Sequence, residues 1–401
     1  MLALLGGLLL LTGGSVTVTA AAAAVQPREC KARSDAPYLP IYHIVGNITH
    51  QDPNKPGSFE TEAINDVSAI FMHMGVWHVF HQCCQNHWDH VVSLDGIHWR
   101  RLPPPVRPST DPAEWYDARG SYDGSISLLP ESEGGIVMLY DAMHNGTGPP
   151  NGSLAVGDDE GWLAVARPKN SSDPFLEVWS KSEQNPVWFD AGEDGTGLVG
   201  GAVFPSGIWK SGDHWNFLSK GDRFFTKDPS FANWTRWRGA DPETEVFMRE
   251  GSGGTGEAGR GEEGGQWFVK LPNTTEGKPP PAGSPTHAAN IFVGNQFALG
   301  DYDEMNESWT LRKIDHRIDT GPTDGWSAAS YAGDRLMNMG WAPRGRTPGG
   351  SGRMMNQNDQ LTIMRDVRWE PRLQTLVANP IEELALLRNG TLAHEGEIRA
   401  R

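Results

Sequence analysis

The sequence predicts an all-β fold, from its composition and from the pattern of its apolar residues. Of the 401 residues, 48 are glycine and 29 are proline, and both types interrupt long helices. Helical periodicity of 3.6 residues appears only in a short piece near residues 381–388. A hydrophobic fraction of 38% with 16 tryptophans supplies a core for one large domain or two of ordinary size.

Strand-like runs of aromatic and β-branched residues recur along the chain, separated by clusters of Gly, Pro, Asp and Asn that indicate turns. Five such runs are residues 77–82, 135–140, 214–218, 291–299 and 335–341. Their spacing is wide and uneven. It therefore favours sheets repeated around an axis, as in a β-propeller, over an immunoglobulin-like sandwich with a turn about every 8–12 residues.

The charge balance excludes some classes of partner. The chain has 34 Lys and Arg against 50 Asp and Glu, a net charge of −16. Nucleic acids and anionic membranes are bound by clustered Lys and Arg, so we expect neither as a partner. An acidic protein is compatible with a neutral ligand such as a sugar.

The first 25 residues predict a secretory signal peptide. They carry no charge, residues 2–11 are rich in leucine, and residues 20–24 offer small side chains for cleavage. The usual basic residues at the start are missing, which leaves an uncleaved membrane anchor as an alternative. Eight N-glycosylation sequons also favour a secreted glycoprotein. They begin at Asn47, Asn145, Asn151, Asn170, Asn233, Asn273, Asn306 and Asn389.

The chain has three cysteines, Cys30, Cys83 and Cys84. A disulfide from Cys30 to one of the vicinal pair is possible and would leave one thiol over. No Cys and His spacing typical of a zinc site is present, and the sequence predicts neither a metal nor a cofactor.

Residues 250–286 interrupt the strand pattern with a Gly/Glu-rich stretch and a Pro-rich stretch. The segment is either a flexible insertion or a loop over a site. The second interpretation comes from Glu257, Glu262 and Glu263, which precede an aromatic run at residues 266–269.

The Asn65-Asp66 pair stands directly before a run of apolar residues that predicts a strand. A carboxylate at that position is either a nucleophile that faces a central cavity or a solvated turn residue. The order of the segments that follow favours the first interpretation.

Taken in order, these segments resemble glycoside hydrolase family 32, the β-fructosidases. Asn65-Asp66 keeps the first two positions of the family motif Asn-Asp-Pro-Asn-Gly, and Gln82 stands at the Gln that follows an aromatic strand. Residues 88–99 match Trp-Gly-His followed by Ser-x-Asp-x-x-x-Trp. Residues 117–125 match Asp-x-x-Gly-x-Trp-Ser-Gly-Ser, with Tyr122 and Asp123 in place of the aromatic residue and the serine.

The resemblance implies a five-bladed β-propeller over residues 26–390, a tail at residues 391–401 and a C-terminal β-sandwich that is largely absent. It also implies that β-fructofuranosidic bonds of sucrose or fructans are hydrolysed with retention and without a cofactor. Asp66 would be the nucleophile and Glu263 the acid/base. The substrate-binding residues would be Asn65, Gln82, Trp88, Tyr122 and Asp123.

Two departures from the family pattern stand out. The Arg-Asp-Pro motif, whose Asp stabilises the transition state, is replaced by Val203-Phe204-Pro205, and Asp190 or Asp194 is the substitute that the chain offers nearby. The Glu-Cys motif of the acid/base is not intact. Glu263 is its best ungapped match, Glu262 and Glu243 are alternatives, and a solvated loop glutamate is the competing interpretation.

Two other functions therefore stay open. One is a carbohydrate-binding propeller that has lost catalysis. The other is a related five-bladed glycosidase that acts on another sugar, such as arabinose, with inversion. We expect Trp88, Tyr122 and Trp267 to stack on the sugar or to belong to the core. His90 and His287 are expected to be hydrogen-bonded structural residues.

Overall fold

The computed structural model describes residues 44, 48–51, 59–61, 64–83, 87–144, 161–190, 204–219, 222–236, 267–292, 296–318, 327–342 and 360–388. The chain divides into two compact units, Met1–Ile41 and Tyr42–Arg401, and the described residues all belong to the second. Among them, helices are short, and none has the length and apolar character needed to cross a membrane. The predicted signal peptide lies outside the described residues.

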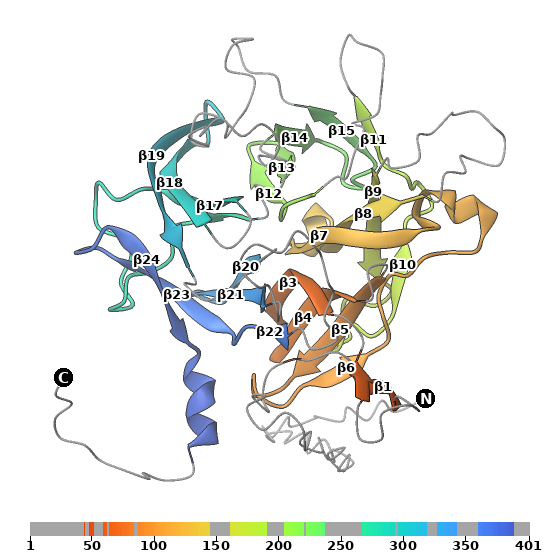
Figure 1. The fold of residues 1–401 in the computed structure, drawn as a ribbon. Helices are drawn as coiled ribbons and strands as arrows, with labels where there is room; N and C mark the ends of the chain where they lie inside the picture. Colours follow the sequence, from red (N-terminus) through yellow and green to blue (C-terminus); the bar gives the residue numbers. More distant parts are fainter. Residues whose placement is uncertain are drawn as a thin grey trace, which may run out of the picture. The chain divides into compact units, whose positions relative to one another are not determined.

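Five sheets contain most of the strands described in the second unit, and we call them blades 1 to 5 (Figure 1). Blade 1 contains β3 (Ile64–His73), β4 (Val76–Cys83), β5 (His87–Ser93) and β6 (Arg100–Leu102). Blade 2 contains β7 (Gly120–Leu128), β8 (Ile136–Met143), β9 (Gly161–Pro168) and β10 (Trp179–Lys181). Blade 3 contains β12 (Trp209–Ser211), β13 (His214–Ser219), β14 (Asp222–Thr226), β15 (Asn233–Arg236) and β11 (Trp188–Asp190).

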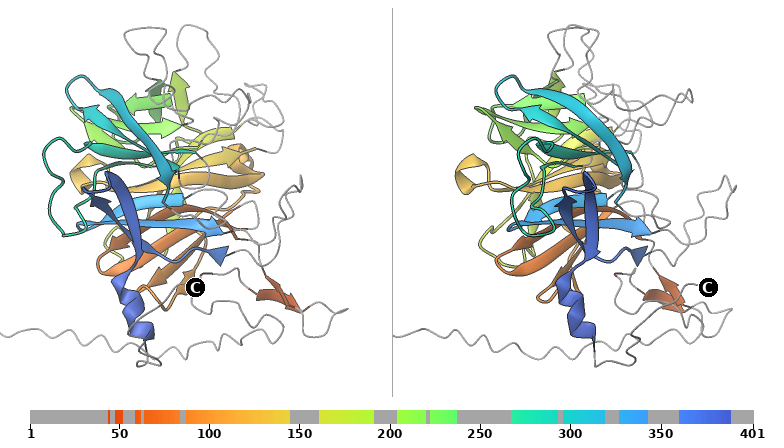
Figure 2. Two further views of the ribbon diagram at one scale, coloured as in Figure 1. Left: turned by 60° about the vertical axis from the view of Figure 1, so that its left-hand side comes forward. Right: turned by 90° about the vertical axis from the view of Figure 1, so that its left-hand side faces the viewer.

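Blade 4 contains β16 (Phe268–Lys270), β17 (His287–Phe292), β18 (Gln296–Asp303) and β19 (Ser308–Arg317). Blade 5 contains β20 (Ser327–Ala332), β21 (Arg335–Ala342), β22 (Gln360–Leu361), β23 (Arg365–Glu370) and β24 (Thr375–Pro380). Outside the blades, β1 (Ile48–Gln51) pairs with β2 (Phe59–Thr61). Short 3₁₀ helices are η1 (Pro112–Asp117), η2 (Glu131–Glu133) and η6 (Glu382–Leu387), and η6 follows β24 (Figure 2).

The apolar cores close the blades into a ring. Buried side chains form a cluster between each blade and the next, and a further cluster joins blade 5 to blade 1. Each cluster contains residues of both neighbouring blades. In ring order, starting with blades 1 and 2, two such members are Phe80 and Tyr140, Leu139 and Phe217, Leu218 and Phe268, Leu299 and Trp369, and Met337 and Ile70. The fold is therefore the all-β, five-bladed propeller that the sequence predicts.

Strand periodicity explains how one sheet serves two interfaces. Successive side chains of a strand point to opposite faces of its sheet. In β3, Ile70 packs toward blade 5 and Phe71 toward blade 2. In β8, Met138 packs toward blade 1 and Leu139 toward blade 3. Strands of this kind are apolar on both faces, which makes them visible as continuous apolar runs in the sequence.

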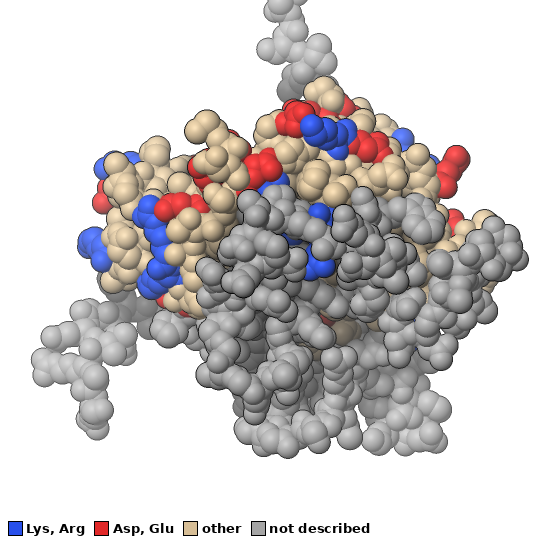
Figure 3. Space-filling view, turned by 90° about the horizontal axis from the view of Figure 1, so that it is seen from above, with Lys and Arg blue, Asp and Glu red and all other residues tan. Residues whose placement is uncertain are grey.

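Four of the five predicted strand runs each correspond to one observed strand, namely β4, β8, β13 and β21. The run at residues 291–299 is wrong as a single strand, because it covers the end of β17 and the beginning of β18. The helical piece expected near residues 381–388 is the 3₁₀ helix η6. On the face drawn in Figure 3, acidic and basic side chains are interspersed over the described residues.

Blade 1 contains three histidines whose side chains are fully buried: His78, His81 and His90. His78 Nε2 donates to the carbonyl oxygen of Pro174 at 3.0 Å, so its Nδ1 accepts from His90 Nε2 at 2.9 Å. Burial lowers the pKa of His78 to about 4 and that of His81 to about 3.

In blade 4, burial lowers the pKa of His287 to about 4, and His287 Nδ1 lies 3.0 Å from Thr286 Oγ1. His90 and His287 are thus hydrogen-bonded core residues, as expected.

These histidines predict a loss of stability in acid. An unfolded histidine binds a proton near pH 6.5, whereas folded His287 does so only near pH 4. The unfolding free energy is therefore unaffected by this group above pH 6.5. As the pH falls from 6.5 to the folded-state pKa, each such histidine lowers the unfolding free energy by about 1 kcal/mol per pH unit. His287→Gln should reduce the slope of unfolding free energy against pH by that amount in urea titrations.

The matched control for this measurement is His98→Gln, because the side chain of His98 is 84% exposed. The control should keep the wild-type slope. An unchanged slope in His287→Gln would contradict the assignment of a buried, neutral imidazole.

Ring closure predicts a large cost for a cavity between blades 5 and 1. Ile70 is fully buried in that cluster, so Ile70→Ala should lower the unfolding free energy by about 2–5 kcal/mol in urea titrations. Leu94→Ala is the control in the same blade, because Leu94 is 72% exposed, and it should change stability by about 0.5 kcal/mol or less. Equal effects of the two changes would show that this interface does not hold the ring together.

Candidate functional site

A β-bulge near the beginning of β3 shapes the candidate site. Ile64 pairs with Cys83 and Val67 with His81, so Asn65 and Asp66 lie opposite the single residue Gln82. Bulges of this kind bend a strand and re-aim its side chains, and they are frequent beside active sites. The predicted nucleophile Asp66 thus lies where the first strand of blade 1 departs from regular pairing.

The Asn65-Asp66 segment is almost entirely enclosed. Asn65 is 7% and Asp66 is 8% exposed, and Gln82 on the facing strand is 4% exposed. Asn65 Oδ1 and Gln82 Nε2 have no hydrogen-bond partner among the described residues. Buried polar atoms are normally paired, so two amides in this state beside a carboxylate suit a hydroxyl-rich ligand.

Blade 2 has a similar bulge near the beginning of its first strand. Ser121 pairs with Ala142 and Gly124 with Tyr140, so Tyr122 and Asp123 lie opposite the single residue Asp141. Asp123 is 7% exposed and Asp141 is 1% exposed, whereas Tyr122 is half-buried. The first strands β3, β7, β12 and β20 surround the middle of the ring in Figure 1, and β3 contacts both β7 and β20. Two bulges with acidic residues therefore lie on adjacent inner strands.

Gly124 has to be glycine at this bulge. A Cβ atom there would collide with the carbonyl oxygen of Leu139 and lie 3.0 Å from Trp88 Cζ2. The absence of a side chain lets β7 approach both β8 and Trp88 closely.

The structure corrects the predicted role of Trp88. Its side chain is fully buried in the cluster between blades 1 and 2, and its Nε1 donates to the carbonyl oxygen of Tyr122. A ring with no exposed face does not stack on a ligand. Trp88 instead holds the backbone of the second bulge, and it acts on the site through Tyr122.

Asp117 anchors the chain just before β7. It is fully buried, accepts a hydrogen bond from Tyr140 Oη at 3.0 Å and pairs with Lys181 Nζ at 2.7 Å. Burial raises the pKa of this carboxyl, and the charge of Lys181 opposes that rise. Through Oδ2, Asp117 therefore fixes the chain just before β7.

In blade 3 the segment that precedes β12 runs between two blades. Ser125 Oγ donates to the carbonyl oxygen of Ser206 at 2.6 Å, and the Leu218 amide donates to Ser206 Oγ at 2.8 Å. Phe204 and Pro205 directly precede Ser206 in this segment. They occupy the positions of the Asp and Pro of the expected Arg-Asp-Pro motif, so the segment has no carboxylate there.

The suggested substitute Asp190 is wrong. It belongs to β11, which pairs with β15 at the opposite edge of blade 3 from β12. The other substitute, Asp194, lies outside the described residues, as do Glu243, Glu262 and the predicted acid/base Glu263. Trp267, which follows that segment, is 2% exposed and belongs to the core between blades 4 and 5, so it is a packing residue.

Asp141 is a site residue that the motifs did not reveal. It faces the second bulge from β8, and its charge raises the pKa of Tyr122, although burial is the larger cause. Arg119 lowers the same pKa and is hydrogen-bonded to Tyr122. The sequence did carry a signal for Asp141: it is an ionisable residue directly after the apolar run of residues 135–140. A charged side chain that continues a buried strand is uncommon and often has a functional role.

Comparison with known proteins gives a sequence match and a fold match. Residues 58–239 match the sequence model described as "Glycosyl hydrolases family 32 N-terminal domain". A fructan 1-exohydrolase of Aegilops tauschii is 25% identical over 370 residues, which are 83% of this chain and 55% of that protein. The β-fructofuranosidase insoluble isoenzyme CWINV2 of Arabidopsis thaliana is 28% identical over 189 residues, 43% of this chain and 28% of that protein. The chain thus spans about half the length, or less, of these relatives.

Solved structures share the fold. Fructan 1-exohydrolase IIa of Cichorium intybus superimposes with a TM-score of 0.61 at 20% identity, over 88% of this chain and 63% of that one. A Bombyx mori β-fructofuranosidase variant in complex with sucrose superimposes with a TM-score of 0.56 at 17% identity, over 89% and 68% of the two chains. Residues 58–239 therefore match, as a divergent sequence, the N-terminal domain of glycosyl hydrolase family 32, and the described part of the chain shares the fold of these solved structures.

Proposed function

We propose that the protein is a secreted glycoside hydrolase that cleaves β-fructofuranosidic bonds of sucrose or fructans with retention of configuration. The observation that carries the proposal is Asp66, buried at a bulge of an inner propeller strand, next to Asn65 in sequence and opposite Gln82 in the strand pairing. The names of the relatives support a fructofuranoside as the substrate class, and a chicory enzyme variant is solved with 1-kestose.

In this mechanism Asp66 attacks the anomeric carbon and forms a covalent fructosyl-enzyme intermediate. Glu263 donates a proton to the leaving oxygen and then accepts one from the water that hydrolyses the intermediate. Asn65 and Gln82 would orient the sugar hydroxyls, since their amides offer one buried acceptor and one buried donor.

The first test is the removal of the nucleophile. Asp66→Ala should lower kcat/KM for sucrose, inulin or levan by at least about 10³-fold, because the covalent step loses its attacking group. Fructose release from the purified protein measures this. The control is Asp213→Asn, because Asp213 is 72% exposed in blade 3.

Two results would contradict the proposed hydrolysis. No fructose from the wild-type protein at any mild pH would contradict the proposal, and so would activity that survives in Asp66→Ala. A product released with inversion would instead favour the related propeller glycosidase that acts on another sugar, whose carboxylates are farther apart.

A second candidate function is a carbohydrate-binding propeller without turnover. The observation in its favour is the Phe204-Pro205 pair at the position of the missing transition-state carboxylate. Loss of one such contact typically costs about 10²–10³ in rate. Calorimetric binding of a fructan without fructose release would favour this function.

We assign part of the missing role to Asp123. It is buried in the second bulge, on the inner strand adjacent to that of Asp66. A carboxylate there can stabilise positive charge that develops on the sugar ring in the transition state.

This assignment predicts that Asp123→Asn lowers kcat by about 10–100-fold while KM stays within about threefold, since the lost contact would form mainly in the transition state. Steady-state kinetics on sucrose measures both constants. A change in KM alone would show that Asp123 is a ground-state binding residue.

We also infer secretion and N-glycosylation, from the apolar start of the chain and the sequons. Among the described sequon asparagines, Asn170, Asn233 and Asn306 are exposed and Asn273 is half-buried. The mature N-terminus and the glycan mass of protein recovered from a eukaryotic secretion host test this inference.

A further inference from the structure

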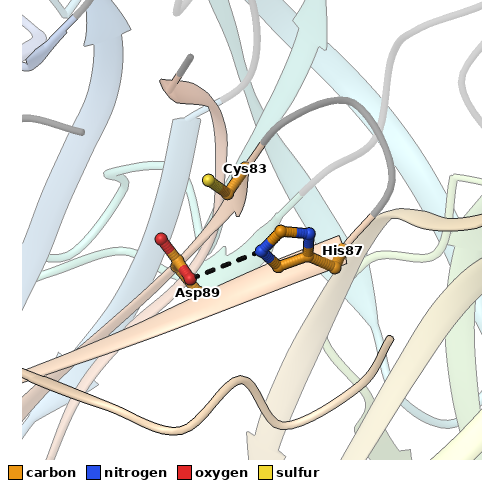
Figure 4. A group of neighbouring side chains, drawn as sticks. All are labelled: Cys83, His87 and Asp89. Atoms are coloured by element: carbon orange, nitrogen blue, oxygen red, sulfur yellow. Dashed lines mark ion pairs between the residues drawn. The ribbon is translucent and has the colours of Figure 1, made fainter. Parts of the chain in front are cut away.

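A group of potential metal ligands lies on blade 1, outside the candidate active site. Cys83 at the end of β4 and His87 and Asp89 on β5 bring a sulfur, a ring nitrogen and a carboxylate oxygen within 4.8 Å of one another. Cys83 and Asp89 are buried and His87 is half-buried. Figure 4 shows the three side chains gathered at the end of the β4–β5 hairpin.

Strand register explains why these residues converge. Cys83 pairs directly with His87, and His81 pairs directly with Asp89. Directly opposed and alternate residues of a strand pair share one face of the sheet, so these four side chains lie on the same face. Gln82 lies between His81 and Cys83 in sequence and therefore points to the other face.

The distance between His87 and Asp89 suits a shared ion. His87 Nε2 lies 3.6 Å from Asp89 Oδ1, which is longer than a hydrogen bond. Two ligand atoms of one tetrahedral Zn²⁺ lie roughly 3.4–3.6 Å apart, given bonds of about 2.0–2.3 Å. The distances from the Cys83 sulfur to the other two ligand atoms are at most 4.8 Å. Side-chain rotation would have to shorten them by about 1 Å when an ion binds.

The second oxygen of Asp89 already has a partner. Arg101 Nη1, on β6, forms an ion pair with Asp89 Oδ2, whereas Oδ1 of the same carboxylate is the oxygen nearer to His87. A ligating carboxylate is commonly held in this way by a group behind it. The Cys83 thiolate and the Asp89 carboxylate together would bring two negative charges to a divalent ion.

His81 lies on the same face but outside the group of three that spans 4.8 Å, so it offers a fourth ligand atom that has to move toward the group on binding. Its Nδ1 donates to the carbonyl oxygen of Gln82 at 2.9 Å, and because a carbonyl oxygen only accepts, Nδ1 carries the hydrogen. In the neutral ring Nε2 then has a free lone pair. Nε2 is buried, and it has no hydrogen-bond partner among the described residues. A histidine that binds a metal through Nε2 usually donates a hydrogen bond from Nδ1 to a carbonyl or carboxylate oxygen behind it.

We propose that Cys83, His87 and Asp89 bind one structural Zn²⁺ ion, with His81 as the fourth ligand, and that the ion ties β4 to β5 behind Gln82. A thiolate, imidazoles and a carboxylate form a donor set that favours Zn²⁺ over Ca²⁺ or Mg²⁺, which prefer oxygen ligands alone. Such a site has no Cys-x-x-Cys spacing, because its ligands face each other across two strands. The sequence therefore did not reveal it.

The test uses the full chain, reduced and stripped of metal, with Zn²⁺ or Co²⁺ alone as the probe. We expect one ion per chain by elemental analysis, a thiolate-to-Co²⁺ charge-transfer band in the ultraviolet, and a rise in Tm on addition of Zn²⁺. Cys83→Ser and His87→Gln should each weaken Zn²⁺ binding at least tenfold. His98→Gln, which alters an exposed His98–Asp95 pair, should leave binding unchanged.

Two wild-type results would overturn the proposal without any variant. One is the absence of the charge-transfer band at one equivalent of Co²⁺. The other is a disulfide between Cys83 and Cys30 or Cys84 in the secreted protein, found by mass spectrometry before reduction, because it would consume the thiolate. Unchanged Zn²⁺ affinity in Cys83→Ser would also overturn it.

Discussion

The packing of blade 5 against blade 1 is the constraint on which the rest of the structure depends. The two blades come from opposite ends of the described chain, and the cluster between them contains Ile70, Met337 and Met339. The backbone contributes as well, since the Leu361 amide donates to the carbonyl oxygen of Ile44 at 3.1 Å. Closing a ring leaves each sheet covered on both faces, which protects strands that are apolar on both sides.

Closure also determines where the chemistry can occur. Because β3 is packed between blade 5 and blade 2, its first residues are held in one register against β4. The bulge at Asn65-Asp66 then directs polar groups out of an otherwise apolar strand. Blade 2 has a second bulge of this kind, at Tyr122-Asp123. There, Gly124 lets β7 approach β8 and Trp88 closely, and Trp88 holds the backbone of Tyr122. Enclosed carboxylates beside amides therefore follow from the same packing that stabilises the ring.

Much of the fold could be predicted from the sequence because the second strand of a blade is apolar on both faces. Four of the predicted runs coincide with β4, β8, β13 and β21, each of which is the second strand of its blade. Short edge strands such as β6, β10 and β16 have three residues each and carry little pattern of their own. The site was harder, because motif order gave Asp66 and Gln82 but not their surroundings. Strand register and strand order decide three features of the site that the motifs do not give. These are the burial of Trp88, the position of Asp190 at the outer edge of its blade, and the pairing of Cys83 with His87.

The proposed hydrolysis with retention requires two carboxylates, Asp66 and Glu263, on either side of the scissile bond. The most direct measurement is a crystal structure with a bound fructoside, in which the separation of the carboxyl groups of Asp66 and Glu263 is read. A separation of roughly 5–5.5 Å, with the anomeric carbon between them, is the result that a retaining hydrolase predicts. A Glu263 side chain in solvent, with no other carboxyl group facing Asp66 across the sugar, would contradict it.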